Sequence, residues 1–204
     1  MIQNFSIFQG LPSNEIDAIA KAAVKKDIPA KTTFIEQGAE SEAAYFILSG
    51  SVTVFRMNEN GEEINIAVLG SGDVVGEMAL IDQEPRSAFV KTLTDTSVLI
   101  LTSHDFKKIL QKHPNTAIHL LSSLSIRIRH TDQHVEDLLT KNLVTRTWNT
   151  LKALEKYFPQ REISLSHEEL ASIIGATRAR VTEALNELAD TQKIALSHRK
   201  IVIH

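Results

Sequence analysis

Residues 28–102 alternate between short apolar runs and turn residues, and this pattern restricts the possible folds more than any other feature of the chain. The runs are rich in Val, Ile, Phe and Thr, and they span residues 45–48, 52–55, 64–69 and 97–101. Many short strands at this spacing favour an antiparallel barrel or jelly roll. Within 58–61, Asn60-Gly61 predicts a hairpin turn because both residues tolerate a positive φ.

Helical spacing surrounds this strand-rich region. We expect helices over 9–27, 104–113 and 115–139, the last of them following Pro114. Apolar residues in the third helix step by three and four, and only Thr131 interrupts them. Such a seam favours a two-stranded coiled coil and hence a homodimer, whereas the alternative is a helix that lies against its own barrel. The seam residues are Leu121, Leu124, Ile128, Val135 and Leu138.

The C-terminal part has the pattern of a DNA-binding module. Asn142 can cap a helix over 143–157, so residues 140–142 form a boundary and hinge. A short strand is expected at 163–165, and Ser166 with Glu169 fits a capping box. Residues 167–186 then match a helix-turn-helix, with Gly175 at the turn. Runs at 194–196 and 201–203 predict a two-stranded wing with a basic tip.

Composition limits the classes of protein that fit this chain. It has 204 residues and no cysteine, which excludes disulfides and thiolate metal sites. No run is long enough to cross a membrane and no secretion signal is visible, so we expect a cytoplasmic protein. The net charge is −3, but residues 141–204 carry ten Lys or Arg against seven Asp or Glu. This asymmetry weakly favours an anionic partner for the C-terminal part.

Residues 76–88, GEMALIDQEPRSA, combine groups that suit a ligand with both a ribose and a phosphate. Glycine lets the backbone approach a ligand closely, and successive backbone N–H groups can hold an anion. A carboxylate such as Glu77 accepts hydrogen bonds from sugar hydroxyls, and the arginine fork of Arg86 fits a phosphate. The alternative is an ordinary surface loop of a barrel, with Arg86 solvated or paired with Glu84.

This segment resembles the phosphate-binding cassette of cyclic-nucleotide-binding domains. The resemblance implies that Arg86 pairs with the cyclic phosphate and that Glu77 accepts from the ribose 2′-hydroxyl. It also implies that Ser87 and the neighbouring backbone complete the cradle. The expected ligand-binding residues in the cassette are Gly76, Glu77, Met78, Ala79, Arg86, Ser87 and Ala88.

Nearly the whole chain resembles the cAMP receptor protein/FNR-type (CRP/FNR) family of bacterial transcription regulators. Further support lies at 7–12, 37–38 and 46–50. The resemblance implies an α+β fold in three parts: a cyclic-nucleotide-binding β-roll (jelly roll) at 1–114, a dimerisation helix and hinge at 115–141, and a winged helix-turn-helix at 142–204. It also implies a regulator rather than an enzyme, since the cassette offers neither a nucleophile nor a metal cluster at the phosphate.

Double-stranded DNA is the expected macromolecular partner, at a palindromic site, with RNA polymerase as a further candidate. Arg178 and Arg180 can fork onto guanine or contact phosphate, and the residues alone do not divide these roles. Family members commonly carry Glu and Arg where this chain has Ala179 and Glu183, which puts the familiar operator in doubt. The expected DNA-contacting residues are Ser166, Thr177, Arg178, Arg180, Thr182, Arg199 and Lys200.

The base of the nucleotide is expected to be read by Thr131 and Asp132, where cAMP receptors show a Thr-Ser pair. A hydroxyl both donates and accepts, so Thr131 suits adenine. An ionised Asp132 only accepts, so it could take the amino group of adenine or bind the N1–H and N2–H groups of guanine. Asp132 has an alternative role as a solvated charge beside the seam. We therefore expect cAMP first, cGMP second and cyclic di-GMP third. A haem or metal effector at His130 and His134 has little support, no metal is expected, and a ligand-independent regulator remains the rival hypothesis.

Overall fold

The computed structural model describes residues 2–40, 42–158, 161–197 and 200–204, and the chain forms two compact units. One unit contains Met1–Val54 and Leu69–Arg129, and the other contains Phe55–Val68 and His130–His204. This division differs from the expected domain borders at residues 114 and 141. Those domain borders stay a prediction.

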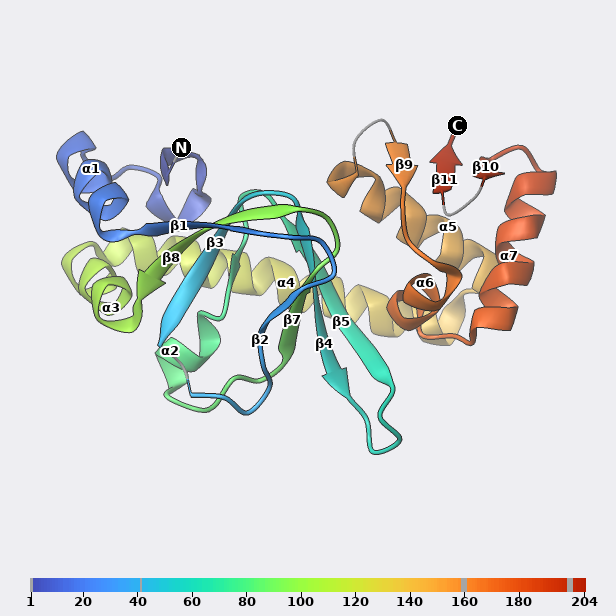
Figure 1. Cartoon of the computed structure of the whole chain (residues 1–204), viewed down its shortest axis with the longest axis horizontal. Helices are drawn as coiled ribbons and strands as arrows, with labels where there is room; N and C mark the ends of the chain where they lie inside the picture. Colours follow the sequence, from blue (N-terminus) through green and yellow to red (C-terminus); the bar gives the residue numbers. More distant parts are fainter. Residues whose placement is uncertain (1, 41, 159–160, 198–199) are drawn as a thin grey trace. The chain divides into compact units, whose positions relative to one another are not determined.

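The strands between residues 24 and 102 form a roll of two four-stranded sheets with helices around them (Figure 1). Most of the roll belongs to the first unit, whereas Phe55–Val68 of β4 and β5 is assigned to the second. One sheet has the strand order β1-β8-β3-β6 and the other β2-β7-β4-β5. The strands are β1 (Val24–Ile28), β2 (Thr33–Ile35), β3 (Ala43–Ser49), β4 (Ser51–Met57), β5 (Glu63–Gly70), β6 (Val74–Val75), β7 (Phe89–Thr92) and β8 (Thr96–Thr102). The helices are η1 (Ile2–Asn4), η2 (Ser6–Phe8), α1 (Ser13–Ala22), α2 (Met78–Asp82), α3 (Ser103–Lys112) and α4 (Pro114–Thr140).

The strand runs read from the sequence are confirmed, since each lies inside β3, β4, β5 or β8. The expected hairpin turn between β4 and β5 is also present, with Gly61 at a φ of 77°. The side chain of Asn58 holds this turn, because its Oδ1 accepts from the backbone N–H groups of Asn60 and Glu62. The turn therefore forms as its local residues dictate.

The expected helix over 9–27 is wrong at its C-terminal end. Helix α1 ends at Ala22, and residues 24–28 form strand β1, which pairs antiparallel with β8. Only Ile28 of this strand is buried, so the strand carries no alternation of apolar and polar residues. Strand β1 forms because β8 offers it a hydrogen-bonding edge, a tertiary cause that has no local signal.

An aromatic cluster holds the N-terminal segment against β3. The ring of Phe46 lies 5.4 Å from that of Phe5, 5.0 Å from that of Phe8 and 6.2 Å from that of Phe106. All four side chains are buried, and Leu120 of α4 belongs to the same core. Burying several aromatic side chains together contributes strongly to stability, so this cluster fixes α3 and the start of α4 on the roll.

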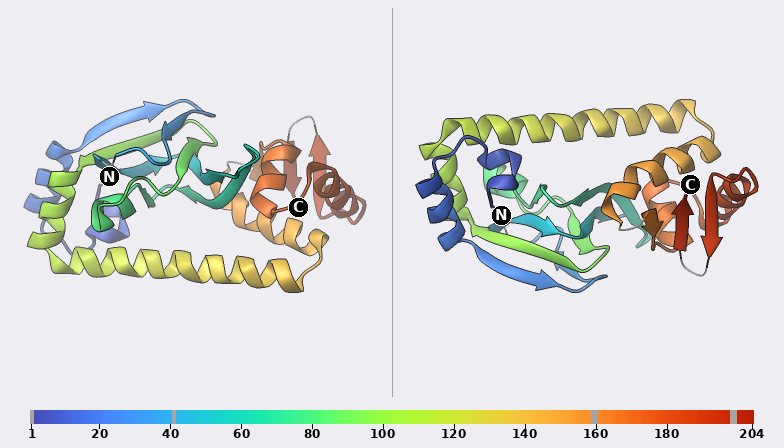
Figure 2. Two further views of the ribbon diagram at one scale, coloured as in Figure 1. Left: turned by 90° about the horizontal axis from the view of Figure 1, so that it is seen from below. Right: turned by 90° about the horizontal axis from the view of Figure 1, so that it is seen from above.

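Helix α4 is one unbroken helix from Pro114 to Thr140 (Figure 2). Most of the expected seam is exposed, with 62% of Leu121, 62% of Ile128 and 50% of Val135 accessible to solvent. Leu124, however, is partly buried and packs against the core of its own unit, and its place in a seam stays a prediction. The exposed apolar residues of α4 are Ile118, Leu121, Ile126, Ile128, Val135, Leu138 and Leu139.

The second unit contains the expected winged helix-turn-helix. Its helices are α5 (Leu143–Leu154), η3 (Glu155–Tyr157), α6 (His167–Ile174) and α7 (Arg178–Asp190), and its strands are β9 (Glu162–Ile163), β10 (Ile194–Ser197) and β11 (Lys200–Ile203). The strands form one sheet in the order β10-β11-β9. Leu165, expected at the end of the first strand, is buried just beyond β9. The turn residue Gly175 has a φ of 71°, and Ala171 and Val181 are buried where the two helices pack.

Both expected helix caps are present in this unit. The side chain of Asn142 accepts from the N–H of Thr145 at 2.9 Å and so separates α5 from α4. Ser166 and Glu169 form the complete capping box, in which each side chain bonds to the other residue's backbone N–H. Within the part of the chain that is described, no helix is both long enough and apolar enough to cross a membrane.

The capping box leads to a first prediction. Ser166→Ala should lower the free energy of unfolding of the chain by about 1 kcal/mol, because the N–H of Glu169 loses its acceptor. Urea unfolding followed by circular dichroism measures this change. Ser164→Ala, at an exposed position two residues earlier, is the matched control and should change stability little. Equal effects of the two substitutions would contradict a stabilising role for the cap.

Candidate functional site

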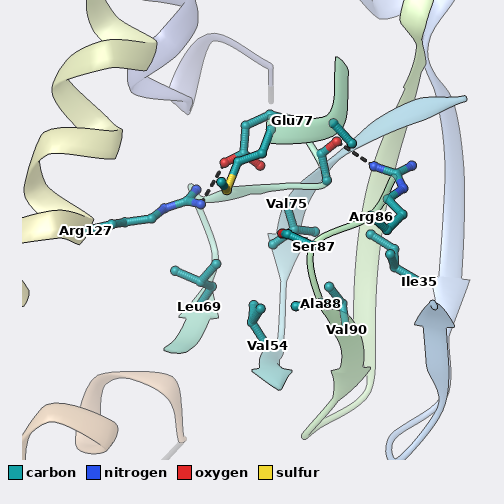
Figure 3. A pocket seen from close by; sticks show the side chains of 13 residues that line it. Ile35, Val54, Leu69, Val75, Glu77, Arg86, Ser87, Ala88, Val90 and Arg127 are labelled. Carbon is teal, nitrogen blue, oxygen red and sulfur yellow. Dashed lines mark hydrogen bonds and ion pairs between the residues drawn. The ribbon is translucent and has the colours of Figure 1, made fainter. Parts of the chain in front are cut away.

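The cassette residues converge on one cavity in the first unit (Figure 3). All seven residues expected there line the cavity. Apolar side chains from the two sheets form its walls, and the sequence did not single them out. The lining is Ile35, Val54, Leu69, Val75, Gly76, Glu77, Met78, Ala79, Arg86, Ser87, Ala88, Val90 and Arg127.

Helix α2 and the loop that follows it shape the cassette. The helix spans only Met78–Asp82. Gln83, the residue that follows it, has a left-handed φ of 63°. The loop is tied to the end of β2, because the N–H of Gly38 donates to the carbonyl of Arg86 at 2.8 Å. In return, the N–H of Arg86 donates to the carbonyl of Ala39 at 2.9 Å. These bonds fix the backbone on both sides of the arginine.

Arg86 is a buried cation that connects three segments of the roll. Its Nη1 donates to the carbonyl of Gly76 at 2.5 Å, and its Nη2 donates to the carbonyl of Ala43 at 2.7 Å. Burial lowers the pKa of the guanidinium, whereas Tyr45, Glu77 and Glu42 raise it. The group stays protonated under ordinary conditions, since arginine starts from a very high pKa. It therefore supplies a positive charge at the edge of the cavity.

Glu77 is almost completely buried, with 1% of the residue exposed. Its Oε1 accepts from Nη1 of Arg127 at 2.8 Å, and Arg127 also donates to the carbonyl of Val74. Burial raises the pKa of Glu77 above its ordinary value, while the charges of Arg127 and Arg86 and a backbone hydrogen bond oppose that rise. Figure 3 shows the Arg127 side chain reaching from α4 toward Glu77.

Arg127 is the main cavity residue that sequence reasoning missed. It precedes Thr131 by one helical turn and faces the roll, as Leu120 and Leu124 do. A basic residue on a long polar helix carries no special signal, so only its position one turn before Thr131 could have suggested it. Thr131 and Asp132 are exposed on α4 and do not belong to the cavity lining.

In the second unit, some of the expected DNA-contacting side chains are exposed, and others are already hydrogen-bonded within the protein. Thr177, Arg178 and Arg180 are exposed at the start of α7. The hydroxyl of Thr182, however, donates to the carbonyl of Arg178 and also bonds to His167. Thr182 is therefore already engaged within the protein.

The remaining expected DNA contacts lie at the cap of α6 and in the wing. The hydroxyl of Ser166 is occupied by the capping box. Nζ of Lys200 pairs with Glu162 at 2.6 Å, although half of the lysine side chain stays exposed. Arg199 lies outside the described residues.

Comparisons with known proteins match both ends of the chain. A family model described as "Cyclic nucleotide-binding domain" matches residues 25–113. A second model, "Crp-like helix-turn-helix domain", matches residues 142–204. These regions contain the helix-turn-helix and every lining residue of the cavity except Arg127.

Individual relatives agree with these matches. The cAMP-activated global transcriptional regulator CRP of Salmonella typhimurium is 30% identical over 86% of this chain and 87% of its own length. The cyclic AMP receptor protein of Thermus thermophilus is 30% identical over 93% of this chain and 88% of its own length. Among solved structures, the c-di-GMP responsive global regulator CLP of Xanthomonas campestris superposes with a TM-score of 0.79 at 22% identity, over 95% of this chain and 99% of that one. At this identity the superposition supports the fold alone.

The contact between Gly76 and Arg86 gives a second prediction. A Cβ added at Gly76 would lie 2.4 Å from Nη1 of Arg86, and the residue has a φ of 76°. Gly76→Ala should therefore displace the guanidinium and also cost about 1 kcal/mol of stability through backbone strain. Calorimetry with cyclic nucleotides and urea unfolding measure the two effects. Gly72→Ala, whose added Cβ has open space at a similarly positive φ, should reproduce only the loss of stability. Unchanged nucleotide binding in Gly76→Ala would contradict this placement of Arg86.

The Glu77–Arg127 pair gives a third prediction, concerning stability and pH. Arg127→Leu should destabilise the chain by about 3 kcal/mol at neutral pH, because it leaves a buried carboxylate without its counter-charge. Without Arg127, the pKa of Glu77 in the folded chain rises further above its value in the unfolded chain. As the pH falls, the folded chain therefore binds a proton at Glu77 before the unfolded chain does. The penalty should therefore shrink between neutral pH and the ordinary pKa of glutamate, and should change no further below it.

Urea unfolding at several pH values measures this penalty. The double variant Arg127→Leu/Glu77→Gln is the control, because it removes the charge as well as its partner. It should lose most of the pH dependence that the single variant shows. A penalty for Arg127→Leu that is constant across this pH range would contradict the buried ion pair.

Proposed function

Because this chain belongs to the CRP/FNR family of cyclic-nucleotide-binding transcription regulators, we propose that its allosteric ligand is cAMP. The chain is a DNA-binding regulator and not an enzyme. One observation carries the proposal for the ligand: a buried carboxylate and a buried guanidinium, Glu77 and Arg86, line the same apolar cavity.

The polar groups of the cavity fit the sugar and the phosphate of a cyclic nucleotide. Glu77 accepts hydrogen bonds from a ribose hydroxyl, and it is held in place by Arg127. Arg86 has five N–H donors and uses two of its nitrogens on backbone carbonyls, so donors remain for a phosphate. The exposed hydroxyl of Ser87 lies next to it and adds a further donor.

The proposal for the base rests on the chemistry of two residues of α4. Thr131 can both donate and accept, which suits the N6 amino group and N1 of adenine. Asp132 accepts only, so it favours the amino group of adenine or the N1–H and N2–H groups of guanine. We therefore keep cGMP as the second ligand and cyclic di-GMP, to which the Xanthomonas regulator responds by its name, as the third.

The working unit is proposed to be a homodimer formed through α4. Large apolar side chains on this helix are exposed in the single chain, among them Ile118, Leu121 and Ile128. An exposed row of this kind favours pairing of two helices, because association removes the apolar surface from water. The dimer would act on DNA in the cytoplasm, with RNA polymerase as a candidate partner.

Ligand and DNA binding are proposed to be coupled through α4 and the hinge at residues 140–142. Contacts between the base and the helix would order its second half beyond Val135 in both protomers. We call α7, the second helix of the helix-turn-helix, the recognition helix. The hinge would then set the recognition helices of the two protomers about 34 Å apart, one turn of DNA, at a palindromic site. Each ligand thereby raises the affinity for the other, as linkage requires.

Calorimetry with a panel of nucleotides tests this proposal and its rivals together. cAMP, cGMP and cyclic di-GMP are titrated into the full chain, and DNA affinity is measured with and without each of them. Tight binding of cAMP with a rise in DNA affinity is the expected result. No binding by any nucleotide, with unchanged DNA affinity, would favour the ligand-independent regulator or one that senses haem or a metal.

Arg86 provides the fourth prediction. Arg86→Ala should weaken cAMP binding about a hundredfold or more, because a buried charged partner of the phosphate is lost. Calorimetry measures the affinity, and thermal unfolding checks that the variant stays folded without its bonds to Gly76 and Ala43. Arg56→Ala, at an exposed arginine of β4, is the control and should bind normally. Undiminished binding in the Arg86 variant would overturn the proposed phosphate contact.

A further inference from the structure

His167 and Thr182 are joined by a side-chain hydrogen bond inside the DNA-binding module. Nδ1 of His167, the first residue of α6, lies 2.8 Å from Oγ1 of Thr182 on α7. The bond is partly buried and links the two helices of the helix-turn-helix. The sequence had suggested Thr182 as a DNA contact and had given His167 no role.

The position of the protons in this bond follows from the second bond of Thr182. Its Oγ1 also lies 2.9 Å from the carbonyl oxygen of Arg178, which can only accept. The single hydrogen of the hydroxyl therefore points to that carbonyl, and His167 must donate to Thr182 through an Nδ1–H. This arrangement fixes the tautomer of neutral His167, whose Nε2 then carries a lone pair and no hydrogen.

His167 is thereby held beside the recognition helix. Thr182 lies one turn beyond Arg178, and Thr177, Arg178 and Arg180 are exposed at the start of this helix. In a helix-turn-helix, the start of the second helix contacts base edges, while the first helix crosses the phosphate backbone. A side chain at the start of α6 that is tied to α7 is therefore placed to meet phosphate.

We propose that His167 contacts a DNA phosphate only in its protonated form, so that DNA binding by this chain is coupled to uptake of a proton. The neutral ring presents a lone pair to phosphate oxygens, which are themselves acceptors, and gains nothing from the contact. The imidazolium keeps its bond to Thr182 and also gains an Nε2–H and a positive charge for the phosphate. The inference rests on the DNA-binding function and adds a pH dependence to it.

Other charged groups lie near His167 on both helices, and they are of both signs. Glu168 and Glu169 follow it on α6, and Glu169 is already engaged with Ser166. Arg178 and Glu183 lie before and after Thr182 on α7. Because a substitution at His167 keeps all of these groups, it isolates the contribution of the imidazole from theirs.

DNA affinity as a function of pH tests the proposal. The full chain and His167→Gln are titrated onto a fluorescent mixed-sequence duplex that spans several helical turns, between about pH 5.5 and about pH 8. The wild-type affinity should rise on the order of tenfold per protomer as the pH falls, while His167→Gln should lose this rise. His130→Gln, at an exposed histidine of α4, is the matched control and should behave like the wild type.

The salt dependence gives a second readout, which a merely structural role would not change. At low pH the slope of log affinity against log salt should be steeper by about 0.9 for each His167 that contacts a phosphate. This increment should be absent in His167→Gln. Identical pH profiles and salt slopes for the wild type and this variant would overturn the proposal. A wild-type chain that binds no duplex at any pH would instead overturn the DNA-binding function itself.

Nuclear magnetic resonance of the imidazole nitrogens tests the tautomer directly. When its ring is neutral, His167 should show an Nδ1–H in the wild type. Thr182→Val removes the acceptor of this proton and should shift the ring toward the Nε2–H form, which can donate to phosphate without a charge. The pH dependence of DNA affinity should therefore flatten in Thr182→Val. A neutral His167 with its proton on Nε2 in the wild type would overturn the proposal.

Discussion

The need to neutralise one buried carboxylate organises the first unit of this protein. Glu77 is almost fully removed from water, and an unpaired charge there would be very costly. Arg127 meets this need from α4, and it thereby holds one face of the helix toward the roll. Leu120 and Leu124 pack on that same face. Leu121 and Ile128 flank this face and remain exposed, and we propose that they meet a second copy.

The same constraint explains what the sequence interpretation of α4 left out. Steps of three and four residues predicted the helix and its ends correctly, because they report only that apolar residues share a side. Leu124 satisfies this spacing as well as Leu121 does, yet it packs into its own unit. Which apolar residues of α4 are left exposed is decided by the tertiary packing around Arg127. No periodicity within the helix contains that information.

Local and non-local causes separate the predictable parts of the molecule from the rest. The cassette was recognisable because its demands are local: Gly76 needs its positive φ, and Arg86 must lie ten residues further on. The caps at Asn142 and Ser166 are local in the same sense. Strand β1 and the apolar walls of the cavity were missed because distant segments impose them. Val54 and Val90, for example, share the cavity only after the sheets have formed.

The recognition helix shows how hydrogen bonds within the protein can limit which side chains are available to contact DNA. The hydroxyl of Thr182 donates to the carbonyl of Arg178 and is also hydrogen-bonded to His167, so it is used within the protein. The exposed charged side chains along the first turns of α7 are then Arg178, Arg180 and Glu183. The two arginines suit guanine or phosphate, whereas a glutamate accepts and therefore suits the amino group of cytosine. A glutamate facing guanine would place acceptors against acceptors. We therefore expect the preferred DNA site to differ from one that is read by arginine at position 183.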